Sequence, residues 1–294
     1  MRKETLASDS LLLLTAAIWG FAFVAQRMGM EFVGPFTFNG VRFLLGAAVL
    51  APVVLRMRGR RGVATAPQQK ASPLAYVAGG VLAGLALFAG ASLQQVGLVY
   101  TTAGKAGFIT GLYVVLVPLL GLFFRQRPGA GTWAGAAMAT AGMYLLSVTD
   151  DFTMSYGDML VLACALAFAL HVLLIGYLAP RLDSVLLSCL QFACCGVLSL
   201  ATALVYEEIA WAGVQAAMLP ILYGGLLSVG VAYTLQVVAQ RKAKPAHAAI
   251  LLSLEAVFAA LGGYLILDEV MDSRALVGCG LMLAGMLASQ LKPD

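Results

Sequence analysis

The chain has 294 residues, of which 61% are hydrophobic and 11% are charged, with a net charge of +4. A soluble domain carries about 25% charged residues, so this chain has too few to cover a water-facing surface. A soluble globular fold is therefore excluded, the outer surface is expected to face a lipid bilayer, and no nucleic-acid partner is expected.

Charged residues, glycines and prolines divide the chain into ten apolar segments, each close to the length that crosses a membrane as a helix. Arg2 and Lys3 before the first segment are also typical of a signal peptide, but that segment has a counterpart later in the chain, so we expect a span. Pro118 lies inside the fourth segment and is expected to kink it. In chain order the segments are 10–27, 36–55, 74–98, 103–124, 132–148, 158–179, 185–205, 218–239, 246–267 and 274–291.

The positive charges predict an orientation for these segments. Fourteen of the 18 Lys and Arg residues fall on one side of the ten-segment pattern, and only Arg27 and Arg274 fall on the other. Cytoplasmic loops carry the excess of Lys and Arg in membrane proteins. We therefore predict a multi-pass protein of the cell (inner) membrane with both termini in the cytoplasm.

The chain also resembles itself. A shift of 149 residues aligns Asp9–Leu13 with Asp158–Leu162, and shifts of 142 to 143 align Leu93-Gln94 with Leu235-Gln236 and Ala141–Met143 with Ala284–Met286. Chance similarity among helices rich in Leu, Ala and Gly is the alternative explanation. Five spans is an odd number, so a second copy inserts upside down, as in carriers with inverted repeats.

These patterns together predict the fold class. It is an all-α integral membrane protein, with ten transmembrane helices arranged as two inverted five-helix repeats around a central cavity. The first repeat covers residues 1–150 and the second covers residues 151–294.

Several short motifs are similar to those of a known family. They are Ala17-Ile18-Trp19-Gly20, Arg42-Phe43, Ser253–Val257, Asp268-Glu269, and Gly278 with Gly285. On these residues the chain resembles the drug/metabolite transporter superfamily, specifically the EamA type with two five-helix repeats. The resemblance implies a ten-helix secondary carrier that exports small metabolites, with the fifth and tenth helices supporting the others from outside.

The same resemblance suggests a range of substrates. The family includes amino-acid exporters, among them the YddG-type exporters of aromatic amino acids, and distant relatives move sugar phosphates and nucleotide sugars. This chain departs from the family pattern at Ala256, where a proline is common. It also has Arg125-Gln126-Arg127 where the repeat would place a counterpart of Asp268-Glu269.

Three ionisable residues lie within predicted spans: Arg42, Lys105 and Glu255. An ionised side chain at mid-span costs about 2.5–3.5 kcal/mol on insertion scales, so such residues are functional candidates. Lys105 and, less easily, Arg42 could instead extend to the membrane surface. Glu255 is too short to do so, and its alternatives are a protonated carboxyl group or a structural hydrogen bond.

The repeat relates polar residues in pairs, and this predicts two polar clusters beside the cavity. Arg42 aligns with Gln191, Gln94 with Gln236, and Lys105 with His247. The first-half members form an external cationic cluster in this prediction, and the second-half members form an internal, mostly neutral one. Hydrogen bonding between helices is the competing explanation for such residues.

Four further residues complete the candidate cavity. Asn39 lies one helical turn from Arg42 and could orient it. Trp19 and Tyr113 are aromatic residues at mid-span that could stack on a substrate, although plain packing is the more common use. His171 is a mid-span histidine, for which an interhelical hydrogen bond is more typical than proton transfer.

These residues predict a secondary exporter that works by alternating access, with amino acids, including aromatic ones, as the favoured substrate. Arg42 or Lys105 would attract a carboxylate, Glu255 an ammonium group, and the aromatic residues an apolar side chain. The alternatives are a carrier of phosphorylated or drug-like compounds, an intramembrane enzyme and a passive channel. No HExxH or GxSxG motif supports an enzyme, and the five cysteines lack metal-ligand spacing, so we expect no metal or other cofactor.

Overall fold

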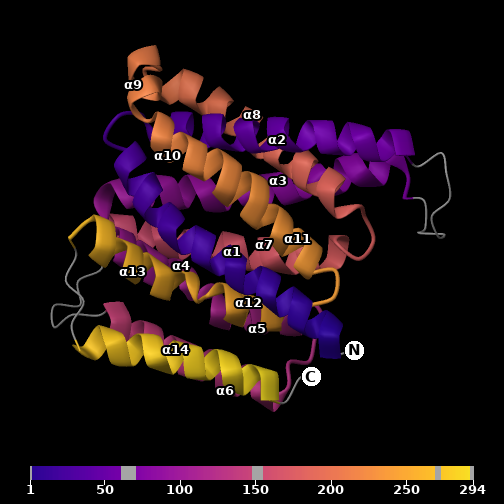
Figure 1. The fold of residues 1–294 in the computed structure, drawn as a ribbon, viewed down its shortest axis with the longest axis vertical. Coiled ribbons are helices and arrows are strands. Elements are labelled where there is room, and N and C mark those ends of the chain that lie inside the picture. Colours follow the sequence, from indigo (N-terminus) through magenta and orange to yellow (C-terminus); the bar gives the residue numbers. More distant parts are fainter. Residues whose placement is uncertain (1, 61–70, 148–154, 269–272, 292–294) are drawn as a thin grey trace.

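A computed structural model describes residues 2–60, 71–147, 155–268 and 273–291 of the chain. All regular secondary structure in these ranges is helical. The axes of the helices are roughly parallel or antiparallel to one another (Figure 1). They are α1 (Arg2–Gly29), α2 (Pro35–Arg60), α3 (Pro73–Tyr100), α4 (Ala103–Gly111), α5 (Tyr113–Phe123), α6 (Ala130–Ser147), α7 (Tyr156–Leu178), α8 (Ser184–Tyr206), α9 (Trp211–Ala216), α10 (Met218–Leu222), the π-helix η1 (Tyr223–Tyr233), α11 (Thr234–Ala239), α12 (Pro245–Leu252), α13 (Glu255–Ile266) and α14 (Ser273–Leu291).

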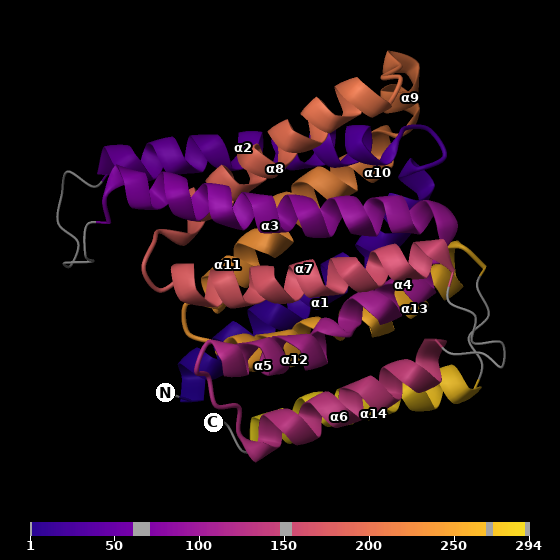
Figure 2. The same ribbon diagram turned by 180° about the vertical axis from the view of Figure 1, so that it is seen from behind.

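The helices confirm the predicted all-helical membrane fold. Eight of the predicted spans are long and apolar enough to cross a membrane: α1, α2, α3, α4 with α5, α7, α8, α10 to α11, and α12 with α13. The predicted fifth and tenth spans correspond to α6 and α14, which pack against each other along one edge of the molecule (Figures 1 and 2). Large apolar side chains such as Phe123 and Leu204 are exposed on the outside, as expected for a surface that faces lipid.

The two halves of the chain run in opposite directions. Helix α1 begins at the end of the molecule where α14 finishes, and α7, its counterpart in the second half, begins at the opposite end (Figures 1 and 2). We call the first of these the terminal end and the second the distal end. The halves interdigitate, because α2 packs on α8, α3 on α7 and α8, and α1 on α13.

Small residues bring helices of the two halves into close contact. A Cβ atom added to Gly97 of α3 would lie 2.6 Å from Cγ2 of Val161 on α7, and one added to Gly157 would lie 2.8 Å from the carbonyl oxygen of Gly97. Neither position has room for a side chain. Close approach through small residues is a common way for membrane helices to associate, because lipid supplies no hydrophobic drive between them.

Two spans are interrupted near their middle, at equivalent positions of the repeat. The fourth span breaks at Leu112, between α4 and α5, and the ninth breaks at Ser253 and Leu254, between α12 and α13. The break at Leu112 lies six residues before Pro118, which is inside α5 and for which a kink is predicted. Pro118 lacks the N–H that would bond to Val114 one turn before it, which weakens the helix on that side.

The eighth span contains a feature that its counterpart lacks. Residues Tyr223–Tyr233 form a π-helix, whereas the corresponding third span is one continuous α-helix, α3. π-Helical turns are frequent at functional sites. Here the π-helix packs against α1 and α2 at the centre of the molecule.

Candidate functional site

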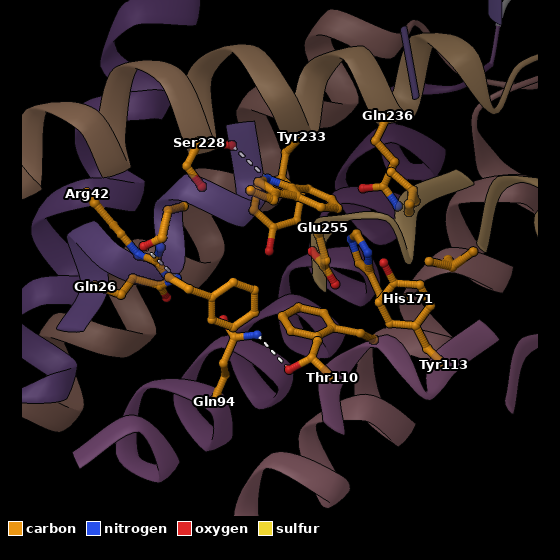
Figure 3. Close-up of a pocket in the computed structure, with 16 residues that line it drawn as sticks. Gln26, Arg42, Gln94, Thr110, Tyr113, His171, Ser228, Tyr233, Gln236 and Glu255 are labelled. Atoms are coloured by element: carbon orange, nitrogen blue, oxygen red, sulfur yellow. Dashed lines mark hydrogen bonds between the residues drawn. The ribbon is translucent and has the colours of Figure 1, made fainter. Parts of the chain in front are cut away.

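A cavity lies between the two halves of the chain (Figure 3). The volume that the centre of a water molecule can reach is about 30 Å³, enough for one or two waters. A metabolite therefore needs the surrounding helices or side chains to move before it can bind. The lining residues are Trp19, Ala22, Phe23, Gln26, Arg42, Gln94, Thr110, Tyr113, Phe168, His171, Val172, Ser228, Tyr233, Gln236, Leu252 and Glu255.

The two helix breaks place Tyr113 and Glu255 in the cavity wall. Tyr113 is the first residue of α5 and Glu255 the first residue of α13, and their side chains are 3% exposed in each case. Both reach into the cavity close to each other (Figure 3). Within the described part of the chain the Tyr113 hydroxyl faces the Glu255 carboxyl group, and neither this hydroxyl nor Oε1 of Glu255 forms a hydrogen bond of ordinary length. Buried polar atoms are nearly always paired, so these two are available to a ligand.

Arg42 is a buried cation of the cavity, with 2% of its side chain exposed. Its Nε donates a hydrogen bond to Oδ1 of Asn39 at 2.9 Å, and Nδ2 of Asn39 donates to the carbonyl oxygen of Ala91 at 3.0 Å. The guanidinium also lies over the ring of Phe43, 5.0 Å from its centroid. None of the described carboxylates forms an ion pair with Arg42. A buried charge without a counter-ion is costly, so this position favours an anionic ligand group.

Neutral polar side chains occupy the remaining wall of the cavity. Nε2 of His171 lies 2.9 Å from Oε1 of Gln191, which is behind it on α8. Nε2 of Gln94 donates to the Thr110 hydroxyl at 3.2 Å. Arg42 lies at one end of the cavity and His171 at the other, with Glu255 between them (Figure 3).

An aromatic surface completes the cavity and depends on the π-helix. The ring of Tyr233 lies 4.4 Å from that of Trp19, measured between centroids. The indole Nε1 of Trp19 donates to the carbonyl oxygen of Ser228, at 3.2 Å. Ser228 and Tyr233 both belong to η1. The π-helix thus holds the indole of Trp19 through a hydrogen bond to Ser228 and a tilted ring contact with Tyr233.

Seven of the ten residues predicted for the cavity line it. These are Trp19, Arg42, Gln94, Tyr113, His171, Gln236 and Glu255. Asn39 and Gln191 stand one layer behind, where they hold Arg42 and His171. Lys105 does not line the cavity: it is in the first turn of α4, 35% exposed, with its Nζ 2.6 Å from Oδ2 of Asp158. Arg42 is therefore the one cation of the cavity among the described residues.

Sequence reasoning missed several lining residues. Gln26, Thr110, Ser228 and Tyr233 are polar residues within spans, and their hydroxyl and amide groups are common at helix contacts, so they carry no signal specific to a cavity. For Tyr233 a signal existed, because it is one helical turn before Gln236, which was selected. Ser228 was not detectable, because only the π-helix directs its backbone toward Trp19.

The family comparison agrees with this arrangement. The model of the EamA-like transporter family matches residues 6–148 and again residues 155–289. The chain belongs to the EamA-like transporter family. The first match covers helices α1 to α6 of this EamA-like transporter and the second covers α7 to α14, five predicted spans each, and this family has a two-repeat membrane fold. It is a multi-pass membrane protein of the drug/metabolite transporter superfamily.

Individual relatives support the same assignment. The transporter is similar to an "Uncharacterized transporter" of Archaeoglobus fulgidus, with 30% identity over 98% of this chain and 87% of the relative. It is also similar to the "Uncharacterized transporter YoaV" of Bacillus subtilis, with 20% identity over 92% of this chain and 91% of the relative. A solved crystal structure shares the fold with a TM-score of 0.75 and 20% identity, and the match covers 98% of both chains.

Proposed function

We propose that this EamA-like transporter exports small zwitterionic metabolites, with amino acids as the substrate class, by alternating access. The observation that carries the proposal is the charge pattern of the cavity. Among the described residues it contains one buried cation without a counter-ion, Arg42, and one buried acid, Glu255, with an oxygen that forms no hydrogen bond of ordinary length. The two charges of an amino acid complement this pair.

The position of each group supports a binding geometry. Arg42 receives the substrate carboxylate, because its Nε is held by Asn39 and the rest of the guanidinium fork can bind a carboxylate with two parallel bonds. Glu255, assisted by the Tyr113 hydroxyl, receives the ammonium group. Trp19 and Tyr233 line the same cavity and favour an apolar or aromatic side chain.

The other predicted residues have supporting roles in this proposal. Gln94, His171 and Gln236 supply neutral hydrogen-bonding groups around the substrate, and Asn39 and Gln191 orient the charged and imidazole groups in front of them. Phosphorylated compounds fit less well. A phosphate dianion would meet a single cation, with an acid in the same cavity, and Lys105 lies outside it.

We further propose that the terminal end faces the cytoplasm of a cell with the protein in its inner membrane. The excess of Lys and Arg in the segments at this end supports that orientation. The boundary between the repeats is proposed near residue 150. The family matches, which stop at residue 148 and resume at residue 155, support it.

Counterflow into proteoliposomes tests the proposed substrate class. Proteoliposomes that contain the purified protein are loaded with unlabelled amino acids, phosphorylated sugars or cationic drugs. Uptake of the same compound in labelled form is then measured. We expect counterflow with amino acids and little with phosphorylated sugars. Turnover of a lipid or peptide without transport, or counterflow with phosphorylated sugars alone, contradicts the proposal.

Variants of the two charged groups sharpen this test. Arg42→Gln and Glu255→Gln are each expected to reduce amino-acid counterflow at least about tenfold. This reduction corresponds to the loss of one charge-assisted hydrogen bond, which contributes about 1.5–3 kcal/mol. Exposed residues of the same types supply matched controls: Arg241→Gln and Glu208→Gln are expected to retain the full rate. Equal counterflow rates for Arg42→Gln and Arg241→Gln would show that Arg42 does not bind the substrate.

A further inference from the structure

An ion pair closes the distal end of the contact between α4 and α7. Nζ of Lys105 lies 2.6 Å from Oδ2 of Asp158, whose side chain is 1% exposed. Asp158 also accepts hydrogen bonds from the Thr101 hydroxyl at 2.8 Å and from the backbone N–H of Ser155 at 2.8 Å. The pair joins the first turn of α4, in the first half of the chain, to the first turn of α7, in the second half.

A second pair lies at the terminal end, between α1 and α12. Nε2 of His247 lies 2.9 Å from Oδ1 of Asp9, and the two side chains are 18% and 12% exposed. The contact is a hydrogen bond with a neutral imidazole and an ion pair with a protonated one. It joins the N-terminal part of α1 to the first turn of α12, again across the two halves.

The two pairs are equivalent under the internal repeat. The shift of 149 residues that aligns the halves carries Asp9 onto Asp158, and the shift of 142 carries Lys105 onto His247. In each pair an acid from the first span of one half meets a basic residue from the fourth span of the other half. Contacts formed by chance are not expected to recur at equivalent positions of the two halves, with the acid and the base in the same spans each time.

Each pair holds one end of a helix contact that borders the cavity. Span 1 (α1) packs along both halves of the broken ninth span, and span 6 (α7) packs along both halves of the broken fourth span. All four spans contribute lining residues. Separation of α1 from α12 opens a route from the cavity to the terminal end, and separation of α7 from α4 opens a route to the distal end.

We propose that Asp9–His247 and Lys105–Asp158 are the two latches of the transport cycle, of which one opens while the other stays closed. This inference rests on the alternating-access part of the proposed function and is independent of the substrate. The breaks at Leu112 and at Ser253 and Leu254 allow the outer half of each broken span to move while the other half stays packed.

The latches differ in strength, and the difference favours one direction of opening. Lys105–Asp158 has a fully buried acid with additional hydrogen bonds from Thr101 and Ser155. Asp9–His247 is more exposed on its acid, and its base is a histidine. The terminal latch therefore opens more readily, which leaves the empty carrier accessible mainly from the terminal end, as suits loading from the cytoplasm.

Hydrogen–deuterium exchange of the full chain in lipid nanodiscs, without substrate, tests this proposal. His247→Met removes the terminal latch, and Lys105→Met removes the distal one. Asp158 is left intact because it also caps α7. Arg241→Met replaces an exposed cation near the terminal latch and serves as the matched control.

His247→Met is expected to raise exchange at least about threefold at the terminal end, in peptides 6–14 and 245–252. It is expected to lower exchange at the distal end, in peptides 101–111 and 155–163. The reason is that the state open at the terminal end gains population at the expense of the state open at the distal end. Lys105→Met is expected to give the opposite pattern, and Arg241→Met to change neither end. His247→Lys keeps the pair and replaces the imidazole with a permanent charge, so it should lower exchange at the terminal end and raise it at the distal end.

Three outcomes in a variant that elutes as a single species would overturn the latch proposal. They are a rise in exchange confined to the substituted end, a rise in exchange at both ends, and no change in exchange. If a methionine variant does not fold, the His247→Lys pattern decides the question by itself. The substrate proposal is judged separately. Failure of amino-acid counterflow with the opposed exchange pattern refutes only the substrate, and normal counterflow without that pattern refutes only the latches.

Discussion

Tyr113 and Glu255 occupy equivalent positions in the two halves of the chain, and each is the first residue after a helix break. The internal repeat thus places a phenol and a carboxyl group opposite each other at the centre of the molecule. The halves differ here in chemistry although their backbones correspond. This difference makes a symmetric scaffold into an asymmetric site, which can distinguish the two ends of a substrate.

Tyr113→Phe is expected to weaken substrate binding without loss of stability. The hydroxyl lies beside the Glu255 carboxyl group but forms no hydrogen bond of ordinary length among the described residues, so its removal breaks no short hydrogen bond within the protein. The KM for the transported amino acid should rise about threefold to tenfold, the equivalent of one hydrogen bond of about 0.5–1.5 kcal/mol. Counterflow kinetics measure the KM, and thermal unfolding in detergent measures stability. A fall in Tm of several degrees would show that the hydroxyl is structural.

Trp19→Ala is expected to reduce transport of aromatic amino acids more than that of alanine, because the indole and the Tyr233 ring together form the aromatic surface of the cavity. Trp19→Phe keeps a ring at this position and loses only the hydrogen bond to Ser228. It should therefore retain most of the preference for aromatic substrates. Competition assays with phenylalanine and alanine measure the ratio. Trp211→Ala, at a residue that is 68% exposed in α9, is the control and should leave the ratio unchanged.

Gly97→Leu is expected to destabilise the protein by about 1–3 kcal/mol or more, because a side chain at this position overlaps Val161 across the contact of α3 with α7. Gly280→Leu is the matched control, since nothing lies within 4 Å of a Cβ atom at that glycine. Thermal unfolding of both variants in the same detergent makes the comparison. Equal Tm values would mean that α3 and α7 separate more easily than their packing indicates.

Glu207→Ala is expected to destabilise the protein by about 0.5–2 kcal/mol, the cost of losing a helix cap. The Glu207 carboxylate accepts hydrogen bonds from the backbone N–H groups of Phe36 and Thr37, at 2.7 and 2.8 Å, and so holds the end of α8 to the start of α2. Its exposed neighbour supplies the control, Glu208→Ala, for which no change is expected. A lower Tm for both variants alike would indicate a general charge effect instead of a cap.

Much of the fold could be predicted from the sequence because its signals are local. An apolar segment of about 20 residues is a membrane helix wherever it occurs, and the predicted spans match the helices closely. The polar residues of the cavity were detectable for the same reason, since an Arg or Glu at mid-span is costly in lipid. Arg42 and Glu255 could thus be selected before any contact was known.

The assignments that needed packing information were less accurate. Lys105 has the same in-span signal as Arg42, yet it pairs with Asp158 at the distal end, 53 residues further along the chain. Pro118 predicted a kink, whereas neither the break at Leu112 nor the break at Ser253 and Leu254 falls on a proline. The π-helix likewise has no sequence signal, because its geometry is stabilised by contacts with α1 and α2.

The sequence by itself determined that the chain crosses a membrane repeatedly and that its second half repeats the first, because hydropathy, charge and internal similarity are properties of short segments. Only the tertiary structure decided which polar residues meet. The cavity and the two cross-repeat pairs bring together side chains that are tens to hundreds of residues apart. Their contacts depend on how the helices pack, and close packing is a property of the whole assembly.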